Sequence, residues 1–363
     1  MDRHVKCVIS FIGVVIFLVV MKLCSSLIMP LMIAVFIFIL VNPVMERMEK
    51  MHIPSPLAMI VVLLLVTCVC IIFVYLLFAM INMILAKLPE YILKVARFDE
   101  YISLKLRDIF NVTESQFPSV ITMLNIDWVG QLKSALTSIS SASVSVLGDV
   151  AMIILYLMFL LMERSTIFPK ISEAFPDSRH EARTLVTNIS HQTSRYLSVK
   201  VLISAATGVL FYLTALISGM DFPLVWGILT FLLNFIPTIG SIVVTVSATF
   251  LAAIQFMPSW SKVFLLFFMF LSIQMILGNV IDPKLQGVQL NLSPLVILIM
   301  LSLWGYIWGL VGMFLAVPIT SVIQVICANI PSLRPFAILL SSGVSKNRTK
   351  KEFGEETDGN CMS

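Results

Sequence analysis

The chain has 363 residues, of which 59% are hydrophobic and 12% charged, and its mean hydropathy is +1.01. A soluble globular protein is roughly 45 to 50% apolar and 25% charged, so this composition excludes that class and indicates a polytopic membrane protein. The net charge is only +4, and the Lys and Arg residues are spread between apolar blocks, which gives no support to nucleic-acid binding.

Residues 1–85 are expected to form N-terminal transmembrane helices. Apolar runs at 5–21 and 23–41 precede a longer run at 56–84. A helix needs about 20 apolar residues to cross the hydrocarbon core, so each run is a candidate span. We expect Asn42-Pro43 to end the second helix, and the third helix to project beyond the membrane.

Residues 86–145 are expected to form a small helical insertion outside the cytoplasm. Charged residues, among them Lys87, Glu90 and Lys94, are interleaved with apolar residues at helical spacing. Long loops are translocated largely regardless of their charge, so Lys and Arg do not oppose this placement.

Residues 146–335 are expected to form the transmembrane transport core. Its first span ends near Met162 and contains Asp149. The charged segment 163–200 is predicted to return to water, with a capping box of Ser178 and Glu181 that begins an amphipathic helix at the cytoplasmic interface. The next span begins at Val201.

The segment from Phe222 to Ser261 contains no Asp, Glu, Lys or Arg and is long enough to cross a membrane twice. Pro237 and Gly240 near its midpoint predict a break in the helix. No Lys or Arg lies near the break, which favours a tip at membrane depth. One interpretation is a discontinuous helix that forms a substrate site with Asn234 and Thr238. The other is two plain helices joined by a tight turn.

The rest of the core is a span at 262–280, a polar interruption at 281–293 and an apolar block at 294–330 that is long enough for two crossings. The span and the interruption supply further candidate substrate-lining residues, namely Gln274, Asn279, Gln289 and Asn291. Residues 336–363 are expected to form a cytoplasmic tail.

The candidate lining residues have neutral hydrogen-bonding side chains, which suit a hydroxylated, uncharged solute, although each could instead cap a helix or bond to a neighbouring helix. Asp149 and Asp282 are the candidates for ion coupling, and both could instead be interfacial. Asp282 could stay ionised near water or pair with Lys284. Because the sequence has no hydrolase, metalloprotease or phosphate-loop motif and no Cys/His metal spacing, we expect no catalytic residue, metal or cofactor.

Three motifs in order along the chain resemble those of the autoinducer-2 exporter family of bacterial permeases. They are LNFIPTIG at Leu233–Gly240, GNVIDPKLQG at Gly278–Gly287, and the Pro-Leu-Val to Ala-Val-Pro run at Ser293–Pro318. Pro30, Asn42, Pro43, Ile53 and Pro54 also fit the N-terminal pattern of that family. The chain departs from the family at Thr238 and Ser241, usually an aromatic residue and a proline, at Ser293, usually histidine, and at Ser55, usually arginine.

The apolar blocks predict an all-α, multi-pass protein with about 7 to 9 transmembrane or re-entrant helices, and the Lys and Arg residues place both termini on the cytoplasmic side. The resemblance implies that this membrane is the cell inner membrane. It implies export of a small polar solute, such as an autoinducer-2-like signalling molecule. A sodium (cation)/proton antiporter is the alternative function, and a membrane scaffold without transport is a third. The expected partners are a small-molecule or ion substrate, the lipid bilayer and further copies of the chain in a homo-oligomer.

Overall fold

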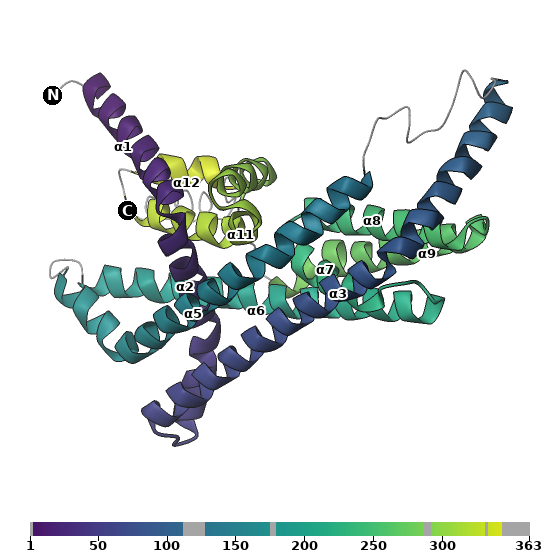
Figure 1. The fold of residues 1–363 in the computed structure, drawn as a ribbon. Helices are drawn as coiled ribbons and strands as arrows, with labels where there is room; N and C mark the ends of the chain where they lie inside the picture. The colour runs from purple at the N-terminus through teal and green to yellow at the C-terminus, as the bar shows by residue number, and fades with distance from the viewer. Residues whose placement is uncertain (1–2, 112–127, 175–178, 287–291, 331–332, 343–363) are drawn as a thin grey trace, which may run out of the picture. The chain divides into compact units, whose positions relative to one another are not determined.

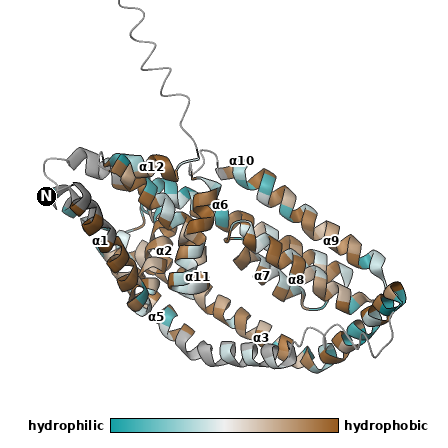
Figure 2. Cartoon of the chain, turned by 90° about the horizontal axis from the view of Figure 1, so that it is seen from above, coloured by the Kyte–Doolittle hydropathy of each residue, from teal (hydrophilic) through white to brown (hydrophobic). Residues whose placement is uncertain are grey.

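The computed structural model describes residues 3–111, 128–174, 179–286, 292–330 and 333–342. In these ranges no strand occurs apart from one isolated β-bridge, between Leu292 and Ser341. Seven of the described helices are long and apolar enough to cross a membrane (Figure 1). Figure 2 shows that hydrophobic residues dominate helices such as α1, α7, α8 and α9. The expected all-α, polytopic fold is therefore confirmed.

The chain forms two compact units, which are described separately. The larger unit contains Ser26–Arg164 and Ser198–Leu285, and the smaller contains Met1–Ser25, Ser165–Leu197 and Gln286–Ser363. The helix α6 (Arg179–Ser218) contributes residues to both. The four segments expected from the sequence, which meet at residues 85, 145 and 335, remain a prediction.

The larger unit contains the whole of the long helix α3 (Ser55–Phe110) and, up to Arg164, the long helix α5 (Trp128–Ala174). The 56 residues of α3 extend over about 84 Å, whereas the hydrocarbon core is about 30 Å thick. The helix therefore exceeds the membrane, as its sequence predicted. The described part of 86–145 consists of extensions of α3 and α5.

The helix α2 (Ser25–Lys50) continues through Pro43, where the sequence predicted its end. Tertiary contacts explain the difference. Arg164 of α5 donates from Nε to Asn42 Oδ1 at 2.7 Å and from a terminal nitrogen to Glu49 Oε1 at 2.8 Å. Asn42 also donates to Glu46 at 2.8 Å. These bonds hold the helix on both sides of the proline, which lacks an N–H of its own.

Two clusters of buried side chains form the core of the larger unit. One joins α2, α3 and α5, and its members are Ala34, Val41, Met45, Ala58, Val62, Val66, Ile153, Leu157 and Leu161. The other joins α3 to α6, α7 (Pro223–Leu233), α8 (Ile239–Phe256) and α9 (Trp260–Gln274). In that cluster Phe211 of α6 stacks on Phe270 of α9, with ring centroids 4.5 Å apart.

Glycines bring α6 and α7 into close contact. A Cβ atom at Gly208 would lie 2.6 Å from the carbonyl oxygen of Gly227, and one at Gly227 would lie 2.9 Å from the Cβ of Tyr212. A side chain at either position would force the two helices apart. Small residues at helix interfaces allow such close packing in membranes.

Asp221, in the turn between α6 and α7, connects that turn to α3. Its carboxylate accepts hydrogen bonds from Lys87, from Tyr91 at 2.9 Å and from Lys94 at 3.3 Å. Its backbone N–H donates to Gln255 of α8 at 2.7 Å. Burial opposes ionisation of the carboxyl, but the hydrogen bonds from Lys87 and Tyr91 outweigh it and hold the pKa of Asp221 below its usual value.

The smaller unit contains α1 (Arg3–Leu23), α11 (Pro294–Asn329) and α12 (Arg334–Leu340). The chain reverses inside α11 at Trp308 and Gly309, whose backbone is not helical, with φ of +63° at Gly309. A Cβ at Gly312 would lie 1.9 Å from the carbonyl oxygen of Trp304, eight residues earlier, which in a straight helix would be about 12 Å away. The block is thus two limbs of a hairpin.

The turn of this hairpin is attached to the end of α1. The indole N–H of Trp308 donates to the carbonyl oxygen of Met21 at 3.1 Å, and the Lys22 ammonium lies 3.4 Å from the centroid of the Tyr306 ring. The carbonyl is one of those left free at the end of a helix, so the indole satisfies a group that has no partner within α1.

We predict that Asp221→Asn lowers the free energy of unfolding by about 1 to 2 kcal/mol at pH 7, because charge-assisted hydrogen bonds are lost. A lowered folded-state pKa stabilises the fold above the unfolded value, about 3.9, and this stabilisation disappears as the pH falls through the folded pKa. Thermal unfolding in detergent should therefore separate the variant from the wild type at pH 7 and 5, and less below pH 4. Asp108→Asn, at an exposed position of α3, is the matched control. If the gap in unfolding temperature between Asp221→Asn and the wild type grew below pH 4, the lowered pKa of Asp221 would be contradicted.

Candidate functional site

The predicted break in the uncharged block is present between α7 and α8. Thr238 adopts φ of +63° and ψ of −54°, and the chain resumes as α8 at Ile239. The Ser241 hydroxyl donates to the carbonyl oxygen of Thr238 at 2.9 Å. A Cβ atom at Gly240 would lie 1.7 Å from the carbonyl oxygen of Leu233, so only glycine fits where the limbs meet.

The limb before the break is too short to cross a membrane. The 11 residues of α7 extend over about 16 Å, roughly half of the hydrocarbon thickness. The helix begins sharply at Pro223, because Phe222 has a left-handed backbone. Residues of α7 and α8 share one buried cluster, so the two limbs pack together. This geometry favours the re-entrant interpretation over two plain membrane-crossing helices.

Buried polar side chains lie on the helices around the break. Asn234, the first residue after α7, is only 7% exposed and donates to the Ser204 hydroxyl of α6 at 3.1 Å. Gln274 at the end of α9 is also 7% exposed, and Thr230 of α7 is completely buried. A polar group in hydrocarbon is costly unless it is paired, so these side chains require an explanation.

Several of these polar atoms have no hydrogen-bond partner within the described residues. They are both amide atoms of Gln274, the hydroxyls of Thr230 and Thr245, and the indole N–H of Trp226. Threonines in apolar helices usually bond to their own backbone, as Thr207 does to Ile203 at 2.7 Å. Thr230 and Thr245 do not. Each orphaned group costs about 1 to 3 kcal/mol, unless a bound molecule satisfies it.

Helix register places these groups at one end of the α6–α9 bundle. Gln274 is 14 residues from the start of α9 and Thr245 is 11 residues from the end of α8, so they lie about 21 and 17 Å from the α8–α9 turn. Thr230 is one turn before Asn234, whose bond to Ser204 fixes the level of α6. We call Ser204, Thr230, Asn234, Thr245 and Gln274 the polar cluster.

A buried ion pair lies one helical turn from this cluster. Lys200 of α6 donates to Asp282 Oδ2 at 3.0 Å, and the two residues are 6% and 8% exposed. Asp282 begins the short helix α10 (Asp282–Gln286), which follows a π-helical turn, η2 (Met275–Ile281). π-Helical turns occur frequently at functional sites, and this one directly follows Gln274.

Comparison with known proteins agrees with the motifs and the fold. The sequence model of a family described as AI-2E family transporter matches residues 11–332. The chain belongs to the AI-2E transporter family. The expected resemblance is therefore confirmed, and with it membership of a family of multi-pass membrane transport proteins.

Curated relatives of this AI-2E family member are similar over most of their length. A putative transport protein of Borreliella burgdorferi is 30% identical over 330 residues, which are 90% of this chain and 88% of the relative. The AI-2 transport protein TqsA of Escherichia coli is 26% identical, with 93% of this chain and 95% of that protein covered. The putative transport protein YhhT of Escherichia coli is 27% identical, with 89% and 90% covered.

The sequence-predicted site residues lie in different environments. Asn234, Gly240, Gln274 and Asp282 are buried, Pro237 is partly buried, and Thr238 is exposed at the tip. Asn279 is exposed and donates to the Met275 sulfur at 2.8 Å, and Asp149 is partly buried on α5. Gln289 and Asn291 lie outside the described residues, as does Ser178 of the predicted capping box. Within the described residues no three His, Cys, Asp or Glu side chains are grouped as a metal site requires.

Two expectations near Asp282 were wrong. Asp282 is buried and bonds to Lys200, whereas the sequence suggested water or Lys284, which is exposed. The helix from Arg179 leads into the next span as expected, but Lys200, the last residue of the segment predicted to lie in water, is buried. A stripe of polar residues on one face of α6 was the signal in the sequence for this buried polar face. Its members, at spacings of four and three, are Lys200, Ser204 and Thr207.

We predict that removing one member of the ion pair destabilises the protein by about 3 to 5 kcal/mol, because the other charge remains buried and unpaired. Asp282→Asn and Lys200→Gln should each lower the unfolding temperature strongly, while the double variant should lose less than the sum of the two. Lys284→Gln is the control and should have no effect. Additive losses in the double variant, measured by thermal unfolding, would show that the pair does not act as a unit.

Proposed function

We propose that this protein is a secondary transporter that exports a small, uncharged, hydroxylated solute across the cell inner membrane. The observation that carries the proposal is the set of orphaned hydrogen-bonding groups on Gln274, Thr230 and Thr245, buried beside a broken helix. An amide and two hydroxyls offer donors and acceptors without charge, which matches the hydroxyl groups of such a solute. Discontinuous helices commonly form substrate sites in transporters.

The neutrality of the polar cluster supports an uncharged solute over an ion. Asp282, the carboxylate of the ion pair one helical turn from this cluster, is already bonded to Lys200, so its charge is compensated. A cation/proton antiporter needs a titratable carboxylate that alternates between ions, and Asp149 on α5 is the candidate that remains. Because one relative is named for AI-2 transport, an autoinducer-2-like molecule is the first solute to test. The proposal includes no enzymatic activity and no cofactor, and a scaffold without transport would leave the orphaned groups unexplained.

We predict that Gln274→Leu lowers solute transport by about tenfold, because one hydrogen bond to the solute is worth about 1.5 kcal/mol. The same change should leave the unfolding temperature equal or higher, since it removes a buried amide that has no partner. Uptake into inverted vesicles or proteoliposomes, with and without imposed proton or sodium gradients, measures the first effect. Gln192→Leu, the same replacement at an exposed position of α6, is the matched control.

Full transport by Gln274→Leu would contradict the proposed site. A solute-independent exchange of sodium for protons that is abolished by Asp149→Asn would instead support the antiporter.

We further propose that both termini are cytoplasmic and that the far end of α3 lies outside. Lys and Arg residues near the C-terminus, among them Lys346, Arg348 and Lys350, support this orientation. In a background without native cysteines, Glu100→Cys should react with an impermeant thiol reagent from outside and Arg183→Cys from inside. Reaction of both from one side would refute the orientation.

A further inference from the structure

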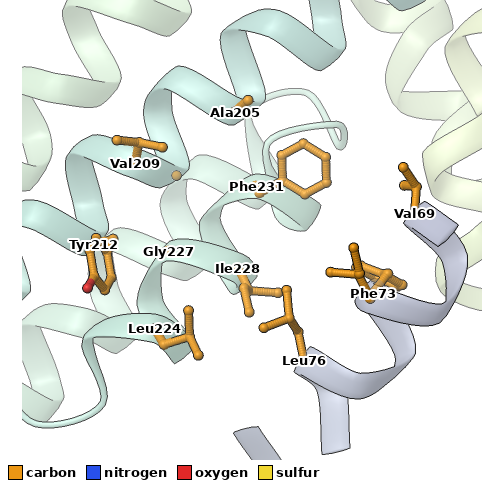
Figure 3. A pocket seen from close by; sticks show the side chains of 12 residues that line it. Val69, Phe73, Leu76, Ala205, Val209, Tyr212, Leu224, Gly227, Ile228 and Phe231 are labelled. Carbon is orange, nitrogen blue, oxygen red and sulfur yellow. The ribbon is translucent and has the colours of Figure 1, made fainter. Parts of the chain in front are cut away.

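An apolar pocket of about 460 Å³ lies between α3 and the paired helices α6 and α7 (Figure 3). Its walls are Val69, Ile72, Phe73 and Leu76 from α3; Ala205, Gly208, Val209 and Tyr212 from α6; and Leu224, Gly227, Ile228 and Phe231 from α7. No wall residue is ionisable at neutral pH, and the Tyr212 hydroxyl is the one polar side-chain group among them. A buried water needs two to four polar partners, so the walls suit an apolar ligand.

The pocket exists because α3 packs elsewhere on both sides of it. Ala58, Val62 and Val66 of α3 belong to the cluster with α2 and α5. Beyond the pocket, Met80 and Tyr91 belong to the cluster with α6–α9. Between these anchors, Val69, Ile72, Phe73 and Leu76 face α6 and α7 across the gap.

The walls cannot close the gap by a simple shift. On one side, the bonds of Asp221 to Lys87, Tyr91 and Lys94 fix the distance of α3 from the α6–α7 turn. On the other, the backbone contact of Gly208 with Gly227 already holds α6 and α7 at their closest approach. The gap therefore persists as an open apolar pocket, and pockets of about 300 to 1,000 Å³ with mainly hydrophobic walls are typical ligand sites.

The occupant must come from the surface that faces lipid, because the pocket is continuous with it. Val69 and Ile72 of α3 are 58% and 52% exposed, and Val209 of α6 is 55% exposed. The gap is thus open to the bilayer on its exposed side, and a second copy of the chain that covered it would change the oligomeric mass of the protein. An acyl chain is the apolar material that a bilayer supplies.

The pocket and the polar cluster lie on opposite faces of the same two helices. At 100° per residue, Ala205 and Val209 point away from Lys200 and Thr207 around α6, while Gly208 lies between the two faces. On α7, Leu224, Ile228 and Phe231 are likewise opposite Trp226 and Thr230. A ligand in the pocket therefore contacts the side of α6 and α7 that faces away from the polar cluster.

We propose that this pocket binds one acyl chain of a membrane phospholipid, which supports α6 and α7 from behind. The supporting role for α6 and α7 rests on the proposed function, whereas the lipid-binding site does not. The site accepts no solute of the class proposed for transport, because such a solute would leave its hydroxyl groups without partners against these walls.

The test uses the full chain with its pocket filled by a side chain. Ala205→Phe places a ring into the pocket, and Ile217→Phe makes the same enlargement on α6 at a position that is 84% exposed. Native mass spectrometry should find one phospholipid fewer on Ala205→Phe than on the wild type and on Ile217→Phe. Added phospholipid should raise the unfolding temperature of the wild type and the control, and at least about tenfold more lipid should be needed for the same rise in Ala205→Phe.

Equal lipid retention by all three proteins would overturn the proposal. A change of oligomeric mass in Ala205→Phe at unchanged lipid content would also overturn it, because a second copy of the chain would then be what covers the pocket. If Ala205→Phe does not fold, Val69→Trp fills the pocket from its exposed α3 wall and is judged by the same criteria. Transport is measured separately. If Ala205→Phe loses the lipid but transports normally, the lipid site stands and the proposed support of α6 and α7 is refuted. If the proposed solute site is wrong, Gln274→Leu transports normally, and lipid retention is unaffected by that result.

Discussion

A membrane interior contains no water, so every polar group there must find a partner within the protein or in a bound molecule. This constraint explains the arrangement around the break between α7 and α8. At the tip, the Ser241 hydroxyl donates to the Thr238 carbonyl, and Gly240 packs against the Leu233 carbonyl. Asn234 donates to the Ser204 hydroxyl. The unpaired atoms of Gln274, Thr230 and Thr245 are exceptions to this rule within the described residues, so each requires a partner from outside them.

The same local design occurs once in each compact unit. Thr238 lies 15 residues after Pro223, and Gly309 lies 15 residues after Pro294; each has φ of +63°. Both helices begin with Pro-Leu-Val, and both hairpins have a glycine that meets a carbonyl oxygen of the preceding limb. Two separate stretches of sequence thus reverse at equal distance from a proline, although one turn contains Pro-Thr and the other Trp-Gly.

The sequence predicted what depends on local chemistry. Apolar length predicted the spans, and Pro237 with Gly240 predicted the break, because both act on the backbone where they stand. The pairing of Lys200 with Asp282 joins residues 82 positions apart, and no local pattern encodes it. The continuation of α2 through Pro43 likewise depended on Arg164, more than 100 residues later. Whether a threonine hydroxyl bonds to its own helix or is left unpaired, as in Thr230, depends on the neighbouring helices.

The tip itself separates positions that can change from one that cannot. Thr238 is exposed and Ser241 is half-buried, whereas any side chain at Gly240 would overlap the Leu233 carbonyl. Thr238 is also a β-branched residue at positive φ, a conformation that costs roughly 1 to 3 kcal/mol. Glycine at 238 would relax that strain and loosen the tip, while other residues there would keep it stiff. Substitutions at 238 and 241 can therefore alter the surface of the tip while the two limbs stay in place, whereas position 240 accepts only glycine.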